Sequence, residues 1–319
     1  MRAGSIAIVG RTNVGKSTLL NKILGERLAI VSPLPQTTRD SLLGVVRREG
    51  AELAFLDTPG FHKPKTELGS RMNSSAFSAA ESADVVVFVT DASAGCKAVQ
   101  KKVKRLEGTP PLVDLAPEDF ELLKGIKSLK KVPAILALNK VDAVRDKGLL
   151  LPLLNSYLEA VPFRALVPLS ALKNDGVDRL LDAIAEVLPE GEACYPEDTL
   201  TDKPSTFFVR EYVREQVLLH LSGEIPHAVA VSIDNFDEGS DKLRIAVTIH
   251  VEKVGQRKIL VGTGGTVIKE LRLGAENRLK QLLGRKVRLE LFVRITPRWK
   301  ETPRMLAELG YDRGSGDKK

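Results

Sequence analysis

An eight-residue glycine-containing segment near the start of the chain constrains the fold more than any other feature of the sequence. It follows the apolar run Ile6–Val9 and consists of Gly10, Arg11, Thr12, Asn13, Val14, Gly15, Lys16 and Ser17. The residues Lys16–Leu24 then have a helical pattern that ends at Gly25. This spacing between a buried strand and a helix is typical of a phosphate-binding loop. The segment therefore predicts a parallel sheet with a phosphate site at one edge.

The residue types in this loop suit a nucleoside triphosphate. Glycines let the backbone wrap closely enough for successive N–H groups to face phosphate oxygens, and the positive end of the following helix adds to the attraction. We expect Lys16 to reach the β- and γ-phosphates and the Ser17 hydroxyl to bind Mg²⁺. We predict that the whole loop and the next residue, Thr18, bind nucleotide.

A second loop follows the apolar run Leu53–Leu56 and consists of Asp57, Thr58, Pro59 and Gly60. A carboxylate at this place can hold Mg²⁺ through water, because that ion keeps part of its hydration shell. The Gly60 N–H can contact the γ-phosphate and lose that contact after hydrolysis, which is how a switch loop works. We predict that all four residues belong to the nucleotide site and that Asp57 is a metal ligand.

A third loop, which follows the apolar run Ala134–Leu138, contains Asn139, Lys140 and Asp142. The Asp142 carboxylate can accept hydrogen bonds from both N1–H and the exocyclic amine of guanine, a pair that adenine does not offer. We expect Lys140 to lie along the base and Asn139 to tie this loop to the phosphate loop. After the run Ala165–Pro168 we expect a backbone N–H for the guanine oxygen from Ser170, Ala171 and Leu172.

The segment between the first two loops contains two neighbouring threonines. We predict that Thr38, in preference to Thr37, joins the Mg²⁺ shell when the γ-phosphate is present. The catalytic set is then Lys16, Thr38 and Gly60. Phe61 follows Gly60, where a glutamine would orient the attacking water in other GTPases, so we expect unassisted hydrolysis to be slow.

The order of elements predicts two domains and a linker. Near-continuous apolar runs that alternate with helical patterns favour an α/β phosphate-loop NTPase domain, with a doubly wound and mostly parallel sheet, over residues 1–188. Residues 189–204 are rich in proline and lack periodicity, which indicates a linker. A smaller α+β module is expected over 205–300, followed by a tail over 301–319. The stretch Ala94–Lys131 is the least regular part of the first domain and could hold an extra helix or a mobile insert.

The second module carries the positive charge of the chain. Between Val251 and Lys300 there are 13 Lys and Arg against 4 Glu, within a protein of net charge +7. A Gly-x-x-Gly turn between two helical stretches is typical of a KH module, whose loop clamps about four nucleotides of RNA. Trp299 could pack or stack on a base. The predicted RNA-binding residues are Lys258, Gly262, Thr263, Gly264, Gly265 and Lys269.

Composition excludes several other classes of protein. The sequence contains no apolar run long enough for a membrane-spanning helix and no export leader pattern. Its two cysteines, Cys96 and Cys194, are far apart and predict neither a disulfide framework nor a zinc site. We expect a cytoplasmic monomer that binds GTP and GDP.

These residues together resemble the Era family of bacterial ribosome-assembly GTPases over nearly the full chain. The resemblance is carried by the phosphate loop, by the KH loop, and by the segments Thr18–Asn21, Asp57–Pro64, Glu224–His227 and Val229–Val231. It implies binding near the 3′ end of 16S ribosomal RNA, a role in maturation of the 30S subunit, and peripheral contact with the inner face of the cell membrane. In related GTPases an asparagine at the place of Asn13 helps to bind K⁺, so the resemblance implies K⁺ beside Mg²⁺.

The sequence departs from the family pattern at two places. Thr12 stands where the family usually has proline, which we expect to change the rigidity of the loop more than its chemistry. The stretch Ala94–Lys131 is longer than usual, and its cluster Lys101, Lys102, Lys104 and Arg105 is either a contact surface or simply solvated.

Two other functions remain open from the residues. A phosphate-loop ATPase or kinase would use the same first loop, although Asp142 argues against it. An RNA-binding scaffold would use guanine nucleotide mainly as a structural ligand.

Overall fold

The computed structural model of the chain describes residues 1–103, 115–239 and 242–311. The chain divides into two compact units, and each is described here by itself. The first unit comprises Met1–Ala29, Thr38–Lys63 and Met72–Asp202, and the second comprises the chain from Lys203 onward together with Ile30–Thr37 and Pro64–Arg71.

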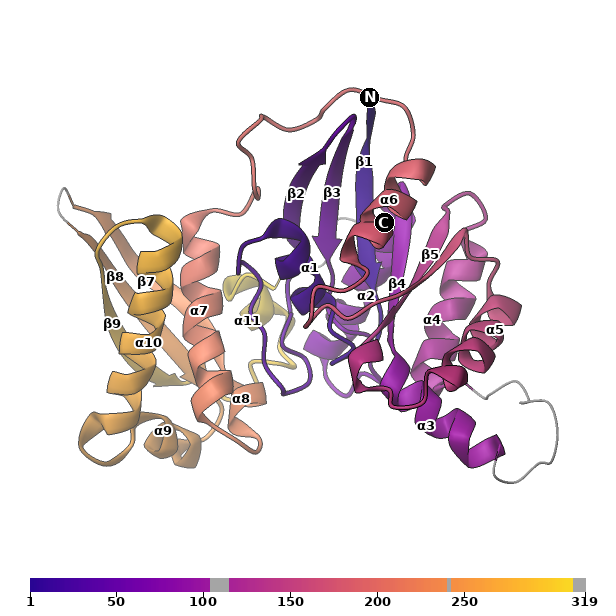
Figure 1. The fold of residues 1–319 in the computed structure, drawn as a ribbon. Helices are drawn as coiled ribbons and strands as arrows, with labels where there is room; N and C mark the ends of the chain where they lie inside the picture. The colour runs from indigo at the N-terminus through magenta and orange to yellow at the C-terminus, as the bar shows by residue number, and fades with distance from the viewer. Residues whose placement is uncertain (104–114, 240–241, 312–319) are drawn as a thin grey trace. The chain divides into compact units, whose positions relative to one another are not determined.

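The first unit contains a six-stranded sheet in the order β2-β3-β1-β4-β5-β6 (Figure 1). Its strands are β1 Arg2–Val9, β2 Leu42–Arg48, β3 Ala51–Asp57, β4 Val85–Asp91, β5 Ala134–Asn139 and β6 Ala165–Pro168. Strand β2 pairs antiparallel with β3, and the other neighbours pair parallel. The predicted doubly wound, mostly parallel sheet is confirmed, with β2 as an antiparallel edge strand.

Helices cover both faces of this sheet, which explains why its central strands are apolar throughout. The helices are α1 Lys16–Leu24, α2 Glu67–Ser82 (from Met72 onward in this unit), α3 Ala92–Val103, α4 Pro117–Ser128, α5 Leu150–Ala160 and α6 Val177–Val187, with short 3₁₀ turns at Val141–Ala143 and Lys147–Leu149. Helices α3, α4 and α5 pack on one face around Phe88, while α1 and α6 contact each other against the other face. Six of the seven residues of β4 are buried as a result.

The least regular stretch of the sequence is mostly helical where the structure describes it. Residues Ala94–Lys131 include most of α3, all of α4 and the turn that leads into β5. Residues 104–114 lie outside the described part, as do the side chains of the cluster Lys101, Lys102, Lys104 and Arg105. Cys96 is buried on α3 and Cys194 is exposed, and both are free thiols.

The proline-rich segment after α6 is attached to the sheet of the first unit over much of its length. Val45 N donates to Leu200 O at 3.0 Å, and Cys194 N donates to a carboxylate oxygen of Glu52 at 2.6 Å. Arg47 also donates to the Tyr195 carbonyl. The segment therefore lies along β2 and β3 although it has no regular structure of its own.

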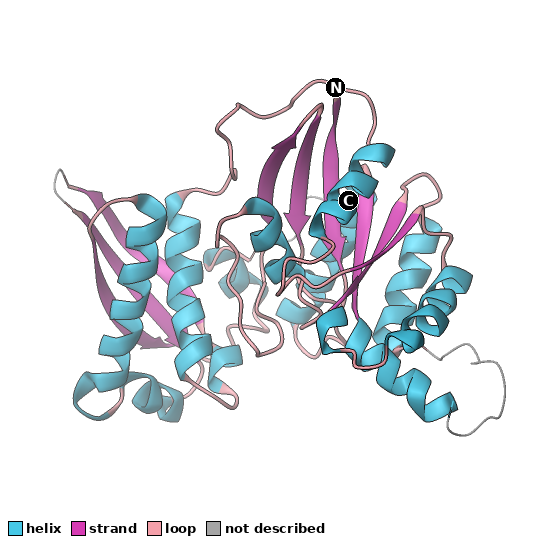
Figure 2. Cartoon of the chain, viewed as in Figure 1, coloured by secondary structure: helices cyan, strands magenta, loops and turns pink. Residues whose placement is uncertain are grey.

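The second unit has a three-stranded sheet in the order β7-β8-β9, with helices on one face (Figure 2). Its strands are β7 Ala230–Glu238, β8 Leu243–Val251 and β9 Val287–Ile295, and its helices are α7 Ser205–His220, α8 Ile225–Ala228, α9 Val254–Val261, α10 Thr266–Leu283 and α11 Pro303–Glu308. Strands β7 and β8 pair antiparallel, whereas β8 and β9 pair parallel. The predicted smaller α+β module is confirmed.

Trp299 is a packing residue of this unit. Its side chain is fully buried, its indole N–H donates to Ala228 O at 2.9 Å, and its ring stacks on Tyr311 with centroids 5.9 Å apart. The ring is therefore not available to stack on an RNA base. No helix within the described residues is long and apolar enough to cross a membrane.

Candidate nucleotide site and RNA-binding loop

The predicted nucleotide loops follow four parallel strands of the first unit. The phosphate loop follows β1, and Ser170–Leu172 comes after β6. The second loop starts at Asp57, the last residue of β3, and the third loop starts at Asn139, the last residue of β5. Because the carboxyl ends of parallel strands meet at one edge of a sheet, all four loops lie at that edge. This is where open α/β sheets bind their ligands.

Gly15 is required at its position by two constraints. Its φ of 99° lies in the left-handed region, and a Cβ built there would come within 2.4 Å of Asn139 Nδ2. Gly15 is the N-cap residue of α1, and its missing side chain leaves room for Asn139 of the third loop to approach. Asn139 uses that proximity, since its Nδ2 donates to Val14 O at 2.9 Å.

Lys16 occupies the space that the loop encloses. Its Nζ donates to Gly10 O at 3.0 Å and to Arg11 O at 2.8 Å, and the residue is buried. Burial lowers the pKa of Lys16 to about 8, although the carboxylates of Asp57 and Asp119 oppose the shift. A triphosphate in the loop would supply the negative charge that keeps this ammonium protonated.

The three predicted Mg²⁺ ligands lie within hydrogen-bond distance of one another. Ser17 Oγ donates to Asp57 Oδ2 at 2.7 Å, and the Thr38 hydroxyl lies 2.8 Å from Ser17 Oγ and 3.3 Å from Asp57 Oδ2. The structure brings Thr38 to this cluster, whereas the Thr37 hydroxyl donates to Leu34 O. Thr38 therefore remains the better candidate of the two.

The chemistry of this cluster fits Mg²⁺. Asp57 is fully buried, and its Oδ1 has no hydrogen-bond partner among the described residues. Burial also raises the pKa of Asp57, against the favourable effect of Lys16 and the two hydroxyls. A divalent cation would satisfy the unpaired oxygen and stabilise the charged carboxylate. Among the described residues no group of three or more His, Cys, Asp or Glu could hold a metal, so a cation here would be held by the single carboxylate of Asp57 together with hydroxyl, phosphate and water oxygens.

The third and fourth loops are held together by Asn139. Its Oδ1 accepts hydrogen bonds from Lys140 N at 2.8 Å and from Ala171 N at 2.9 Å. Ser170 Oγ donates to Asp142 Oδ1 at 2.6 Å, which orients the carboxylate that we predict reads guanine. Leu172 is exposed, with 67% of its surface accessible, and only its backbone is suited to the predicted role.

Asp91, at the end of β4, is a site residue that the sequence reasoning missed. Its Oδ2 accepts a hydrogen bond from Lys140 Nζ at 2.8 Å, and the same ammonium donates to Asn13 O at 2.6 Å. These bonds hold the Lys140 side chain across the phosphate loop. Burial raises the pKa of Asp91, but the hydrogen bond from Lys140 and the other interactions of the carboxylate outweigh burial, so the pKa is lowered overall. A polar residue that ends a buried strand at this edge was the available signal.

The segment that follows the second loop is attached to the phosphate loop. Thr58 Oγ1 donates to Ile8 O at 2.7 Å, and Phe61 N donates to Gly10 O at 3.1 Å. The Phe61 ring packs edge-on against Phe77, with centroids 5.5 Å apart. Phe61 is therefore partly packed into the core, and its side chain has no group that could orient water.

The predicted RNA-binding loop of the second unit is an exposed turn with a special backbone. Gly262, Gly264 and Gly265 have φ values of 76°, 62° and 77°. A Cβ at Gly264 would meet nothing within 4 Å, so the surface over this glycine is open. The side chains of Lys258 and Lys269 are exposed on the two helices that flank the turn. The turn, its amides and these two cations can accommodate a phosphodiester backbone.

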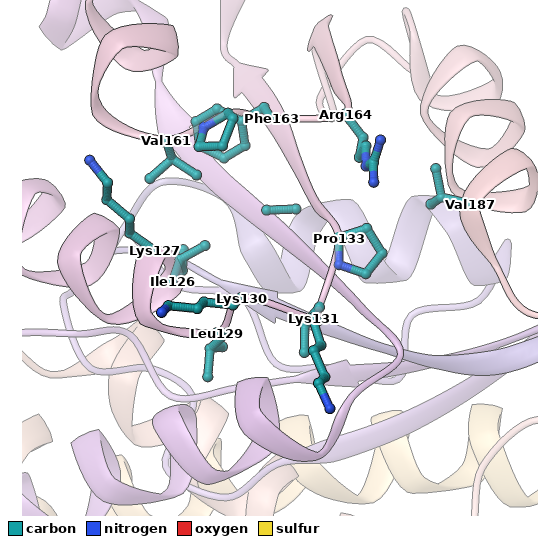
Figure 3. Close-up of a pocket in the computed structure, with 13 residues that line it drawn as sticks. Ile126, Lys127, Leu129, Lys130, Lys131, Pro133, Val161, Phe163, Arg164 and Val187 are labelled. Carbon is teal, nitrogen blue, oxygen red and sulfur yellow. The ribbon is translucent and has the colours of Figure 1, made fainter.

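A separate basic groove lies at the opposite edge of the first unit's sheet, where β5 and β6 begin. It has a volume of about 800 Å³ and an apolar floor that includes Leu129 and Val161. Figure 3 shows its basic side chains, which are Lys127, Lys130, Lys131 and Arg164. It belongs to a different surface from the four nucleotide loops.

Comparison with known proteins finds relatives of both units of the chain. Residues 5–140 match the family model described as 50S ribosome-binding GTPase, and residues 224–300 match the KH domain model. GTPase Era of Ruminiclostridium cellulolyticum is 38% identical over 311 residues, which cover 97% of each chain. GTPase Era of Geobacter metallireducens is 40% identical over 312 residues, which cover 97% of this chain and 98% of the relative.

Two crystal structures are similar over almost the whole chain. The first is a point variant of Aquifex aeolicus Era bound to GDP·AlF₄⁻, with a TM-score of 0.88, 37% identity and coverage of 98% of this chain and 99% of that one. The second is Era in complex with MgGDPNP and nucleotides 1506–1542 of 16S ribosomal RNA, with the same TM-score, identity and coverage.

Proposed function

This chain belongs to the Era family of GTPases and is a GTP hydrolase, and on that premise we propose that it binds 16S ribosomal RNA near the 3′ end through its KH module and acts in maturation of the 30S subunit. The observation that carries the RNA-binding part is the exposed Gly262–Gly265 turn with Lys258 and Lys269 on either side. A similar structure binds nucleotides 1506–1542 of this RNA, which supports the choice of ligand.

In this proposal, different residues of the nucleotide site bind the phosphates, select the base and hold the metal ion. The backbone of Gly10–Thr18 holds the phosphates, and Lys16 stabilises the charge that develops on the leaving and transferred groups. Asp142 and the loop after β6 select guanine. Ser17, Thr38 and Asp57 would hold Mg²⁺, which when bound neutralises the charge of the β- and γ-phosphates. The Gly60 N–H positions the γ-phosphate.

Phe61 leaves the positioning of the attacking water to other groups. A bound K⁺ at Asn13 would place a second positive charge beside the phosphates, as the family resemblance implies. Hydrolysis in NaCl and in KCl at equal ionic strength tests this part of the proposal: equal rates would remove K⁺ from the mechanism.

The protein acts, in this proposal, as a monomer in the cytoplasm with peripheral contact with the inner membrane. Sedimentation equilibrium measures whether the protein is a monomer. Flotation with liposomes made from bacterial lipids measures the membrane contact, and full recovery of the protein from the lipid-free fraction would contradict that contact.

Single-turnover hydrolysis of GTP, with and without an RNA that contains the 3′ end of 16S ribosomal RNA, tests the central proposal. We expect the RNA to change the rate, because this proposal couples RNA binding by the KH module to the GTP-dependent order of the Thr38 and Gly60 loops. A rate that is the same with this RNA and with an RNA of scrambled sequence would favour a scaffold whose RNA binding is independent of hydrolysis. Competition by ATP at an affinity similar to that of GTP would contradict the role of Asp142.

A further inference from the structure

Asp119 is a buried carboxylate that none of the nucleotide motifs contains. It lies in the first turn of α4 and is almost completely buried. Its Oδ1 accepts a hydrogen bond from Arg11 Nε at 2.7 Å. Its Oδ2 accepts hydrogen bonds from Thr90 Oγ1 at 3.1 Å and from Tyr157 OH at 2.9 Å. Three segments that are far apart in sequence therefore converge on one carboxylate.

The contact with Arg11 is an ion pair shielded from water on one side. The Asp119 side chain is 1% exposed and that of Arg11 is 24% exposed. Burial raises the pKa of Asp119, and the guanidinium of Arg11 is the largest opposing cause. Because an arginine side chain stays charged, the loss of either partner would leave the other partner's charge unpaired where it is poorly solvated.

The backbone of Arg11 lies at the centre of the phosphate site although its side chain leads away to α4. Arg11 O accepts a hydrogen bond from Lys16 Nζ at 2.8 Å. Arg11 also forms a parallel bridge with Phe61, in which Phe61 N donates to Gly10 O at 3.1 Å. Arg11 thus contacts both Lys16 and the segment after Gly60, which are the two parts of the site that we expect to face the γ-phosphate.

We infer that Asp119 is a positioning residue for GTP hydrolysis: through its ion pair with Arg11 it fixes the start of the phosphate loop and the junction of that loop with the segment after Gly60. Asp119 does not touch the nucleotide in this assignment. Its effect falls on the γ-phosphate end of the site, because Lys16 and Gly60 act there, whereas guanine is held by loops that Asp119 does not contact.

Asp119→Asn in the full-length protein tests the inference, because the amide keeps the shape of the side chain and removes its charge. We expect kcat for GTP hydrolysis to fall about tenfold or more, with KM changed by less than about threefold. The complex with GDP and aluminium fluoride should weaken more than the complex with GDP alone. A kcat within twofold of the original protein, in a folded variant, would overturn the inference.

A double-mutant cycle with Arg11→Gln separates positioning from a general structural role. If Asp119 acts through Arg11, either single substitution and the double substitution lower kcat by similar factors, whereas multiplying losses would show two independent effects and contradict the mechanism. Lys127→Gln, at the other end of α4, is the matched control and should leave kcat unchanged. If Asp119→Asn does not fold, Arg11→Gln still decides the matter, because an unchanged kcat there would also overturn the inference.

Discussion

At the scale of single residues, the nucleotide site contains buried ionisable groups whose charged forms bound nucleotide and its metal ion would stabilise. Lys16 has a pKa lowered to about 8 by burial, and Asp57 has a raised pKa and one carboxylate oxygen without a hydrogen bond among the described residues. Both pKa shifts favour the neutral form of the side chain, and bound phosphate and a cation would favour the charged form instead. The affinity for nucleotide should therefore depend on pH.

Nucleotide affinity should fall as the pH rises above about 8, because free Lys16 then begins to lose its proton. The triphosphate raises the pKa of Lys16, so binding above this pH takes up a proton and loses up to about tenfold in affinity per pH unit. Calorimetric titration with a non-hydrolysable GTP analogue, in two buffers of different ionisation enthalpy, measures the proton uptake. An affinity that stays constant through this range, without proton uptake, would contradict the shift.

Asp142→Asn should move the preference of the site from guanine towards xanthine nucleotides. The amide can donate a hydrogen bond to the carbonyl that xanthine carries at its 2-position, whereas it can no longer accept two hydrogen bonds from guanine. We expect GTP affinity to fall by at least about tenfold and XTP affinity to rise. Ser170→Ala is the matched comparison, since it removes only the hydroxyl that orients the carboxylate at 2.6 Å. Unchanged selectivity in Asp142→Asn would remove this residue from base recognition.

At the scale of elements, the phosphate loop and the predicted RNA-binding turn each connect two elements of regular secondary structure. Strand β1 and helix α1 bracket the phosphate loop, and helices α9 and α10 bracket the Gly262–Gly265 turn. Gly265 is the N-cap of helix α10, and its left-handed conformation brings the chain out of the turn. The turn can thus present its backbone to RNA while both helices stay packed on the sheet.

Gly264→Asp should weaken RNA binding with little effect on the fold. The new side chain enters open space, where it places bulk and negative charge in the path of the phosphates, although the φ of 62° carries some strain. Gly284→Asp is the matched control, because Gly284 has a φ of 63°, an equally open Cβ position and a place at the end of α10. We expect RNA affinity to fall at least about tenfold in the first variant only. Equal losses in both variants would refute the clamp.

At the scale of the whole molecule, the chain joins a GTPase unit to a second unit with a basic segment, which we propose binds RNA. Thirteen Lys and Arg against four Glu between Val251 and Lys300 make long-range attraction to RNA a property of the second unit. Only some of these cations can touch phosphates, because several have partners in the protein. Arg272 pairs with Glu276 and Arg278 pairs with Glu215, for example.

RNA affinity should therefore decline with salt by less than the number of basic residues suggests. For a single strand, the slope of log affinity against log salt is about −0.7 per phosphate neutralised. We expect a slope that corresponds to fewer contacts than the cations of this segment, and Lys258→Gln or Lys269→Gln should each reduce it by about one contact. Titration of a fluorescent 3′-end RNA at several KCl concentrations measures the slope. A slope that neither substitution changes would place the RNA on another surface.

Much of the site was predictable because its motifs are local and each follows a buried strand. The spacing from Gly10 to Ser17 needs only a strand before it and a helix after it, and β1 and α1 supply both. The apolar run before Asp57 and the one before Asn139 indicate parallel strands, so their carboxyl ends had to meet.

Other features depended on contacts between segments that are distant in sequence. Strand β2 was missed, because its place at the edge beside β3 comes from pairing rather than from its own pattern. The segment after α6 has no periodicity, and only its hydrogen bonds to β2 and β3 show that it follows the sheet.

The sequence by itself determined that this protein has a phosphate loop, a loop with the residue pattern that we predict reads guanine, and a Gly-x-x-Gly turn, because each is specified by neighbouring residues and their backbone preferences. Only the tertiary structure decided that Asp119 pairs with Arg11, that Asp91 holds Lys140, and that Thr38 joins Ser17 and Asp57. The physical reason is that a buried polar side chain needs a partner, and packing chooses that partner from anywhere along the chain.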